Sequence, residues 1–111
     1  MLTFGSNPIF LYDGPVDMRK SFDGLSVLVH QAFPDRLLGG AFFVFVNRRQ
    51  NHVKVLTWDG DGLVVWHKRL ERGTFRISEA AAGLMSRREF TMLLEGISPK
   101  RLNKRFAVKL E

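Results

Sequence analysis

The sequence contains no cysteine. This absence excludes disulfide bonds and metal sites built from thiolates, and it weakly favours a reducing compartment. No stretch approaches the ~20 apolar residues that a membrane-spanning helix needs, so no membrane partner is expected. The first residues also lack the basic and apolar regions of a secretory signal peptide, and we therefore expect a cytoplasmic protein.

Acidic residues are scarce, since 11 Asp and Glu face 17 Lys and Arg and the formal net charge is +6. The excess is uneven, because residues 97–111 hold five basic residues and one acidic residue, which leaves +2 for the first 96. A chain of 111 residues has the size of one ordinary domain. We predict a single α+β domain over residues 1–97 and a basic C-terminal tail over residues 98–111. Such a tail is either an arm that contacts phosphates or a solvated terminus.

The segment from Phe42 to Arg69 contains three apolar, β-prone runs joined by two turns, and it reads FFVFVNRRQNHVKVLTWDGDGLVVWHKR. Asp-Gly between β-branched and aromatic residues is a strong hairpin signal, because glycine tolerates positive φ. A two-residue loop at Gly60-Asp61 sets the register, with Trp58 opposite Leu63 and Lys54 opposite His67. Both faces of this hairpin are mainly apolar near the turn, so we expect both to be covered.

The flanking segments predict short strands at Ile9–Tyr12 and near Phe75–Ile77, while residues 78–84 stay ambiguous. A helix is expected to begin around Asp17 to Ser21 and to end at Pro34, and a second helix to begin at the capping box Ser86-Arg87-Arg88-Glu89. The first helix has an apolar stripe formed by Phe22, Leu25, Leu28, Val29 and Ala32. The predicted fold class is α+β: a small antiparallel sheet of about four or five strands with two main helices packed on it.

Strand pairing in this register gathers basic residues at one end of the sheet, which suits phosphate contact. The alternative is a solvated sheet end that is partly paired with Glu71. The candidate nucleic-acid-binding residues at the sheet end are Arg48, Arg49, Lys54, Lys68, Arg69 and Arg72, and those in the tail are Lys100, Arg101, Lys104 and Arg105. Trp58 and Trp66 are interpreted as core residues rather than as platforms for bases, because valines and leucines flank them.

Catalytic patterns are absent from the sequence. The carboxylates that could hold Mg²⁺ have explanations in turns and helix entry, and the acidic turn lies at the end opposite the basic residues. The histidines lack metal-ligand spacing and the serines lack a nucleophile elbow. These candidates are Asp13, Asp17, Asp23, Asp59 and Asp61, then His30, His52 and His67, then Ser21, Ser26, Ser78 and Ser86. We predict a protein that is not an enzyme, with no cofactor, no metal and no small-molecule substrate.

Several separated motifs occur in a recognisable order along the chain. They are PVDMRKSFDGL at 15–25, VFVNRR at 44–49, VKVLTWDGDGL at 53–63, WHKRLE at 66–71 and LLEGI at 93–97. Together they resemble the TnpB-like accessory proteins, products of the second open reading frame, of the insertion-sequence sixty-six family of bacterial transposons. The resemblance runs from about Ile9 to Ile97, and residues 77–85 depart from it where a proline-bearing loop usually stands.

The resemblance implies a role in the recombination of a bacterial transposable element, beside a separate and larger transposase, and it supplies no catalytic residues. We predict a transposition accessory protein that assists this transposase by non-catalytic contact with DNA. The alternative is a protein-interaction scaffold that holds the transposase and binds no DNA. The oligomeric state and any DNA sequence preference stay open.

Overall fold

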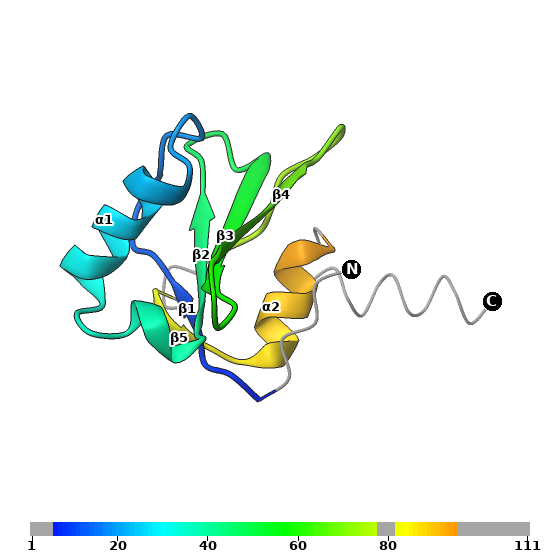
Figure 1. Ribbon diagram of the computed structural model, residues 1–111. Coiled ribbons are helices and arrows are strands. Elements are labelled where there is room, and N and C mark those ends of the chain that lie inside the picture. Colours follow the sequence, from blue (N-terminus) through cyan, green and yellow to red (C-terminus); the bar gives the residue numbers. More distant parts are fainter. Residues whose placement is uncertain (1–5, 78–81, 96–111) are drawn as a thin grey trace.

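The computed structural model describes residues 6–77 and 82–95 of the chain. Within these residues, a mixed sheet of five strands separates two α-helices, with α1 on one face and α2 on the other (Figure 1). The strand order across the sheet is β4-β3-β2-β1-β5. The elements in chain order are β1 (Ile9–Leu11), α1 (Phe22–Ala32), the 3₁₀ turn η1 (Leu37–Gly39), β2 (Phe42–Val46), β3 (His52–Trp58), β4 (Leu63–Arg69), β5 (Gly83–Met85) and α2 (Arg87–Leu94). The predicted α+β class is confirmed.

One strand pair departs from the antiparallel sheet expected from the sequence. β1 and β2 are parallel, whereas the pairs β2–β3, β3–β4 and β1–β5 are antiparallel. The chain leaves β1, passes through α1 and returns to enter β2 in the same direction, which is how a helical crossover joins parallel neighbours. The two carboxyl ends of β1 and β2 therefore meet at one end of the sheet.

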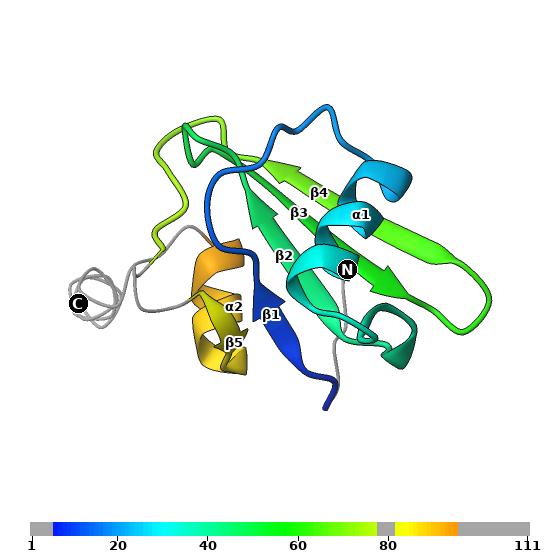
Figure 2. The same cartoon turned by 90° about the vertical axis from the view of Figure 1, so that its left-hand side faces the viewer.

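The β3–β4 hairpin has the register predicted from the Asp-Gly turn, with Trp58 opposite Leu63 and Lys54 opposite His67. The Asp59 amide donates a 2.9 Å hydrogen bond to the Gly62 carbonyl and closes a two-residue loop. Gly60 has a φ of 85°, a backbone conformation that glycine adopts without steric cost and that tight hairpin turns require. Figure 2 shows this hairpin extending beyond the rest of the sheet.

Gly60→Val is expected to destabilise the protein by ~1–3 kcal/mol, because a β-branched side chain resists positive φ. The substitution meets no neighbouring atom within 4 Å, so backbone strain is the cause and steric clash is not. Urea unfolding measures the change as a lower midpoint at an unchanged slope. An unaltered midpoint would contradict the strain assigned to this turn.

The two faces of the sheet bury separate apolar clusters, and both cover β2 and β3. On the α1 face, Leu25 and Val29 of the helix pack on Phe43 and Phe45, all fully buried. On the α2 face, the core consists mainly of Val44, Val53, Val55, Phe75, Phe90 and Leu93. The predicted cover on both faces is thus confirmed for β3, and β2 is covered on both faces as well.

β4 is less covered than the sequence indicated. Its residues alternate between half-buried and exposed, and the side chain of Val64 near the turn is 40% exposed. Trp66 packs against the α2-face core as predicted, and Trp58 is half-buried. The apolar stripe of α1 is also narrower than expected, because Phe22 is 46% exposed and Ala32 is exposed.

The strand predicted near Phe75–Ile77 is wrong, and the edge strand on that side is β5 instead. Phe75 is fully buried in an irregular segment, where its amide donates to the Gln50 carbonyl. One buried ring anchors this segment, and no ladder of hydrogen bonds forms there. The capping box of α2 is confirmed, since Ser86 and Glu89 each bond to the other's backbone N–H. The sequence also predicts that this helix ends at Gly96, because glycine commonly follows the last residue of a helix, and Gly96 lies outside the described residues.

Candidate nucleic-acid interface

The β2–β3 turn is held by the side chain of Asn47. Its Oδ1 accepts hydrogen bonds from the amides of Asn51 (3.0 Å) and His52 (2.9 Å), and its Nδ2 donates to Asn51 Oδ1 (2.7 Å). Gln50 has a φ of 59° in this turn. Asparagine side chains commonly replace backbone partners in tight turns. The result is a fixed loop on which Arg48 and Arg49 are exposed.

The segment after β4 lies beside this turn, as Figure 2 shows. The Leu70 amide donates to the Asn51 carbonyl (2.8 Å), and the Phe75 amide donates to the Gln50 carbonyl. These bonds hold the two ends of the exposed loop that carries Arg72 against the β2–β3 turn. Together with Arg69, which follows from the β3–β4 pairing, these residues form what we call the basic end: Arg48, Arg49, Arg69 and Arg72.

The members of the basic end differ in their ion pairs. Arg69 Nη2 lies 2.9 Å from Glu71 Oε1, and both side chains are exposed, so part of its charge is neutralised. Among the described residues, Arg48, Arg49 and Arg72 have no acidic partner. Arg76, an exposed residue next to Phe75, also lies in the segment held against the turn. Sequence reasoning missed Arg76, because nothing in the local pattern ties residues 75–76 to Gln50.

Two of the predicted binding residues hold helices and loops to the sheet. The Lys54 side chain is only 7% exposed, and its Nζ donates to the carbonyls of Met18 (2.8 Å) and Lys20 (2.7 Å). On the opposite face, Lys68 Nζ donates to the Leu94 carbonyl at the last residue of α2. A lysine at this position complements the negative end of the helix dipole. Both ammonium groups are bonded to backbone carbonyls, so we do not count Lys54 and Lys68 as members of the basic end.

The tail residues Lys100, Arg101, Lys104 and Arg105 lie outside the described residues.

Near the basic end, Asp17 is paired with Arg19 at 2.7 Å. The hydrogen bonds from Arg19 lower the pKa of Asp17 to about 2, so this carboxylate stays charged and occupies the arginine beside it. The acidic turn at Asp59 and Asp61 lies at the other end of β3 and β4, as predicted.

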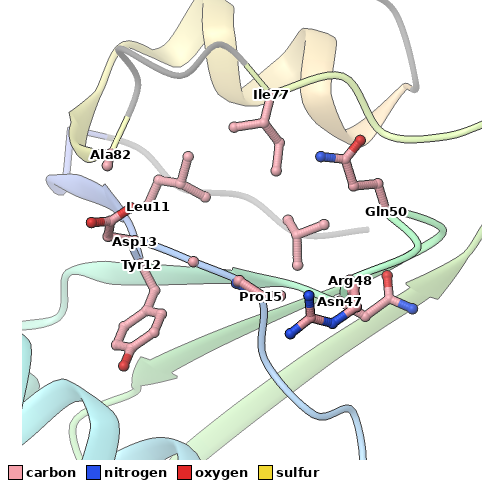
Figure 3. A pocket seen from close by; sticks show the side chains of 11 residues that line it. Leu11, Tyr12, Asp13, Pro15, Asn47, Arg48, Gln50, Ile77 and Ala82 are labelled. Carbon is pink, nitrogen blue, oxygen red and sulfur yellow. The ribbon is translucent and has the colours of Figure 1, made fainter.

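Arg48 stands between two hollows in the surface. The first, of about 320 Å³, lies at the carboxyl ends of β1 and β2. Apolar and polar side chains line it. Figure 3 shows Leu11 and Ile77 together with Asp13, Arg48 and Gln50. Val46 also lines this hollow. The second, of about 430 Å³, lies between the loop before α1 and the β2–β3 turn, and Arg49 and His52 line it. Concave surfaces focus the field of the charges that line them.

Two histidines on adjacent strands lie on the α1 face near the basic end. His52 Nδ1 and His67 Nε2 are 2.8 Å apart, so one ring donates a hydrogen bond to the other. The partial removal of its ring from water, followed by the charges of Lys54, His52 and Arg69, lowers the pKa of His67. These effects all disfavour the protonated ring in the folded protein.

His67→Gln is expected to make stability less dependent on pH. The folded protein holds a proton on His67 less readily than the unfolded chain, so the contribution of His67 to stability is complete above its ordinary pKa of 6.5 and is lost as the pH falls. Urea unfolding of wild type and variant between about pH 7 and about pH 5 measures the difference. His30→Gln, on the exposed side of α1, is the matched control. Equal losses of stability in wild type and His67→Gln would contradict the prediction.

In the part of the chain that the structure describes, no three His, Cys, Asp or Glu residues are grouped so as to hold a metal ion. No helix within residues 6–77 or 82–95 is long and apolar enough to cross a membrane. The basic end carries exposed guanidinium groups on fixed loops beside two hollows. Guanidinium groups bind anionic groups well, so this arrangement suits an anionic ligand.

The chain belongs to the family described as IS66 Orf2 like protein, whose model matches residues 7–104. It is similar to two proteins of Sinorhizobium fredii (strain NBRC 101917 / NGR234). It is 33% identical to the uncharacterized protein y4jC over 93 residues, which cover 82% of this chain and 80% of that protein. It is 35% identical to the uncharacterized protein y4hO over 100 residues, with 87% of each chain covered. No solved structure matches.

The family predicted from the motifs is confirmed, and the match extends slightly beyond Ile9–Ile97. Membership makes this chain a transposition-associated accessory protein, with the transposase of an insertion sequence as the partner that the family suggests. The family is not a known catalytic family. The function of the basic end therefore has to be argued from its own geometry.

Proposed function

We propose that this protein assists the transposase of its element by non-catalytic contact with DNA through the basic end and the basic tail. The observation that supports the proposal is the exposure of Arg48, Arg49 and Arg72 on loops at the same end of the sheet. Within the described residues no acidic side chain neutralises them. Arginine forks match phosphate geometry, and phosphate contacts supply most of the affinity of non-specific DNA binding.

The support comes from position as well as charge. Two backbone hydrogen bonds and the Asn47 side chain fix the loops that carry these arginines, so less conformational entropy is lost on binding. Arginines on loops at a sheet end contact the backbone of a duplex without entering a groove. Such contacts set position and carry no sequence information. The proposed binding is therefore tolerant of sequence.

The hollow beside Arg48 favours a second candidate function. Leu11, Val46 and Ile77 offer an apolar surface that suits a side chain from a protein partner. In this alternative the protein is a scaffold that holds the transposase and binds no DNA. The arginines would then pair with carboxylates of the transposase.

A titration of duplex DNA with purified protein at two salt concentrations tests the proposal, performed with and without a transposon-end sequence. We expect affinity to fall steeply as salt increases and to be similar for both sequences. If no DNA binds while the purified transposase is still captured, the scaffold function replaces the proposal. A strong preference for the transposon end would contradict purely phosphate-based contact.

A further inference from the structure

β4 forms one edge of the sheet, and in the described part of the chain no strand pairs with its outer side. The Asp59 amide bonds to the Gly62 carbonyl and the Leu70 amide to the Asn51 carbonyl. Because paired residues alternate in an antiparallel ladder, Val64, Trp66 and Lys68 bond to β3. The backbone N–H and C=O groups of the other residues point away from β3, and these residues are Leu63, Val65, His67 and Arg69.

This edge has little of the protection that natural sheets use. Edge strands are usually short, or carry proline, bulges or charges along their length. β4 is seven residues long and contains no proline. Its charged residues lie only towards Arg69, whereas the half from Leu63 to Trp66 is apolar and its Val64 side chain is 40% exposed. By contrast, the opposite edge β5 is only three residues long.

We infer that β4 pairs antiparallel with β4 of a second copy of this chain, with the two-fold axis at Trp66. This register uses every outward backbone group of the strand. Val65 of each copy bonds to His67 of the other, and Leu63 bonds to Arg69. A shift of one residue in either direction leaves part of the strand unpaired. Contact of a surface with itself is the usual form of a two-fold dimer.

The charges of β4 fit this self-pairing. Each charged or titratable residue meets an apolar one: Lys68 faces Val64, and Arg69 faces Leu63. A parallel pairing in register would place Lys68 on Lys68 and Arg69 on Arg69, which is destabilising. Arg48 and Arg49 lie on the β2–β3 turn away from this edge and stay available.

Sedimentation velocity on nucleic-acid-free protein, from micromolar to hundreds of micromolar, tests the dimer. We expect the wild type to dimerise and Val65→Pro to sediment as a monomer. Proline at Val65 removes an outward N–H and leaves the ladder to β3 intact. Val65→Thr keeps that N–H and is the matched control, expected to dimerise. Circular dichroism and thermal unfolding show whether each variant is folded. A wild type that stays monomeric, or a folded Val65→Pro that still dimerises, would overturn the inference.

Disulfide trapping tests the register, and the absence of native cysteine makes it clean. Residues on the axis form a non-hydrogen-bonded pair with Cα atoms ~4.5 Å apart, within the range a disulfide spans. Oxidised Trp66→Cys is therefore expected to run as a covalent dimer. Val64→Cys is the control, because its two copies lie about 13 Å apart across the axis. Since Trp66→Cys removes core packing, a mixture of Val64→Cys and Lys68→Cys, which face each other, is the second test. This register is wrong if Val64→Cys forms a covalent dimer by itself. It is also wrong if neither Trp66→Cys nor the mixture of Val64→Cys and Lys68→Cys forms a covalent dimer.

Discussion

Arg48→Gln/Arg49→Gln is expected to weaken binding to every duplex DNA about equally. Both side chains are exposed on the β2–β3 turn, and in the described residues neither has an acidic partner. If each contacts one phosphate, the slope of log affinity against log salt should become shallower by ~0.9 per lost contact. The double variant should keep nearly wild-type stability, because surface substitutions away from such interactions usually change it by less than about 0.5 kcal/mol.

Arg36→Gln/Arg88→Gln is the matched control for charge. It removes the same net charge from exposed residues remote from the basic end, one before η1 and one in the first turn of α2. Deletion of residues 98–111 measures the contribution of the tail. If the control pair lowers affinity as much as Arg48→Gln/Arg49→Gln, binding follows net charge and the basic end is not a defined surface. A wild-type slope in Arg48→Gln/Arg49→Gln combined with loss of binding in the deletion would assign binding to the tail alone.

Local turn chemistry predicted the central part of this fold well. Asp-Gly with alternating apolar residues fixed the β3–β4 register residue by residue, and Ser86 with Glu89 fixed the start of α2. Contacts between segments distant in sequence were harder to predict. The parallel pairing of β1 with β2 depends on where α1 returns the chain, and no local signal in Ile9–Leu11 states it. Phe75 joins the core through one ring and one backbone bond to Gln50, and no local signal in its segment distinguishes this arrangement from the strand that was predicted.

For the basic residues too, the sequence predicted some positions correctly and missed the structural role of others. The strand register correctly brought Arg69 and the β2–β3 turn to one end of the sheet. It also assigned Lys54 and Lys68 to opposite faces, yet charge alone gave no sign that their ammonium groups are used within the fold. Each binds backbone carbonyls from segments more than twenty residues away in sequence. A lysine between two valines in a strand that is buried on both faces is the signal that could have identified Lys54 as structural.

Lys54→Ala is expected to lower stability by roughly 2–4 kcal/mol. The side chain is 7% exposed, and its Nζ holds the loop before α1 through the carbonyls of Met18 and Lys20. Truncation removes two hydrogen bonds from a charged donor and leaves a cavity on the α1 face. Lys54→Met retains most of the volume and should lose about half as much. Urea unfolding with an unchanged slope measures both differences.

Measurements of unfolding stability and of the salt slope of DNA binding should distinguish the buried Lys54 from the exposed arginines of the basic end. Lys54→Met loses a positive charge, yet it should leave the salt slope of DNA binding unchanged, because its ammonium group is occupied by carbonyls and does not reach phosphate. Lys20→Gln removes an exposed charge from the same loop and should alter stability by less than about 0.5 kcal/mol. A stable Lys54→Met with a shallower salt slope would show that Lys54 leaves its carbonyl partners to bind DNA. A destabilised Lys54→Met with the wild-type slope would make Lys54 a structural residue that holds the loop before α1 to the sheet.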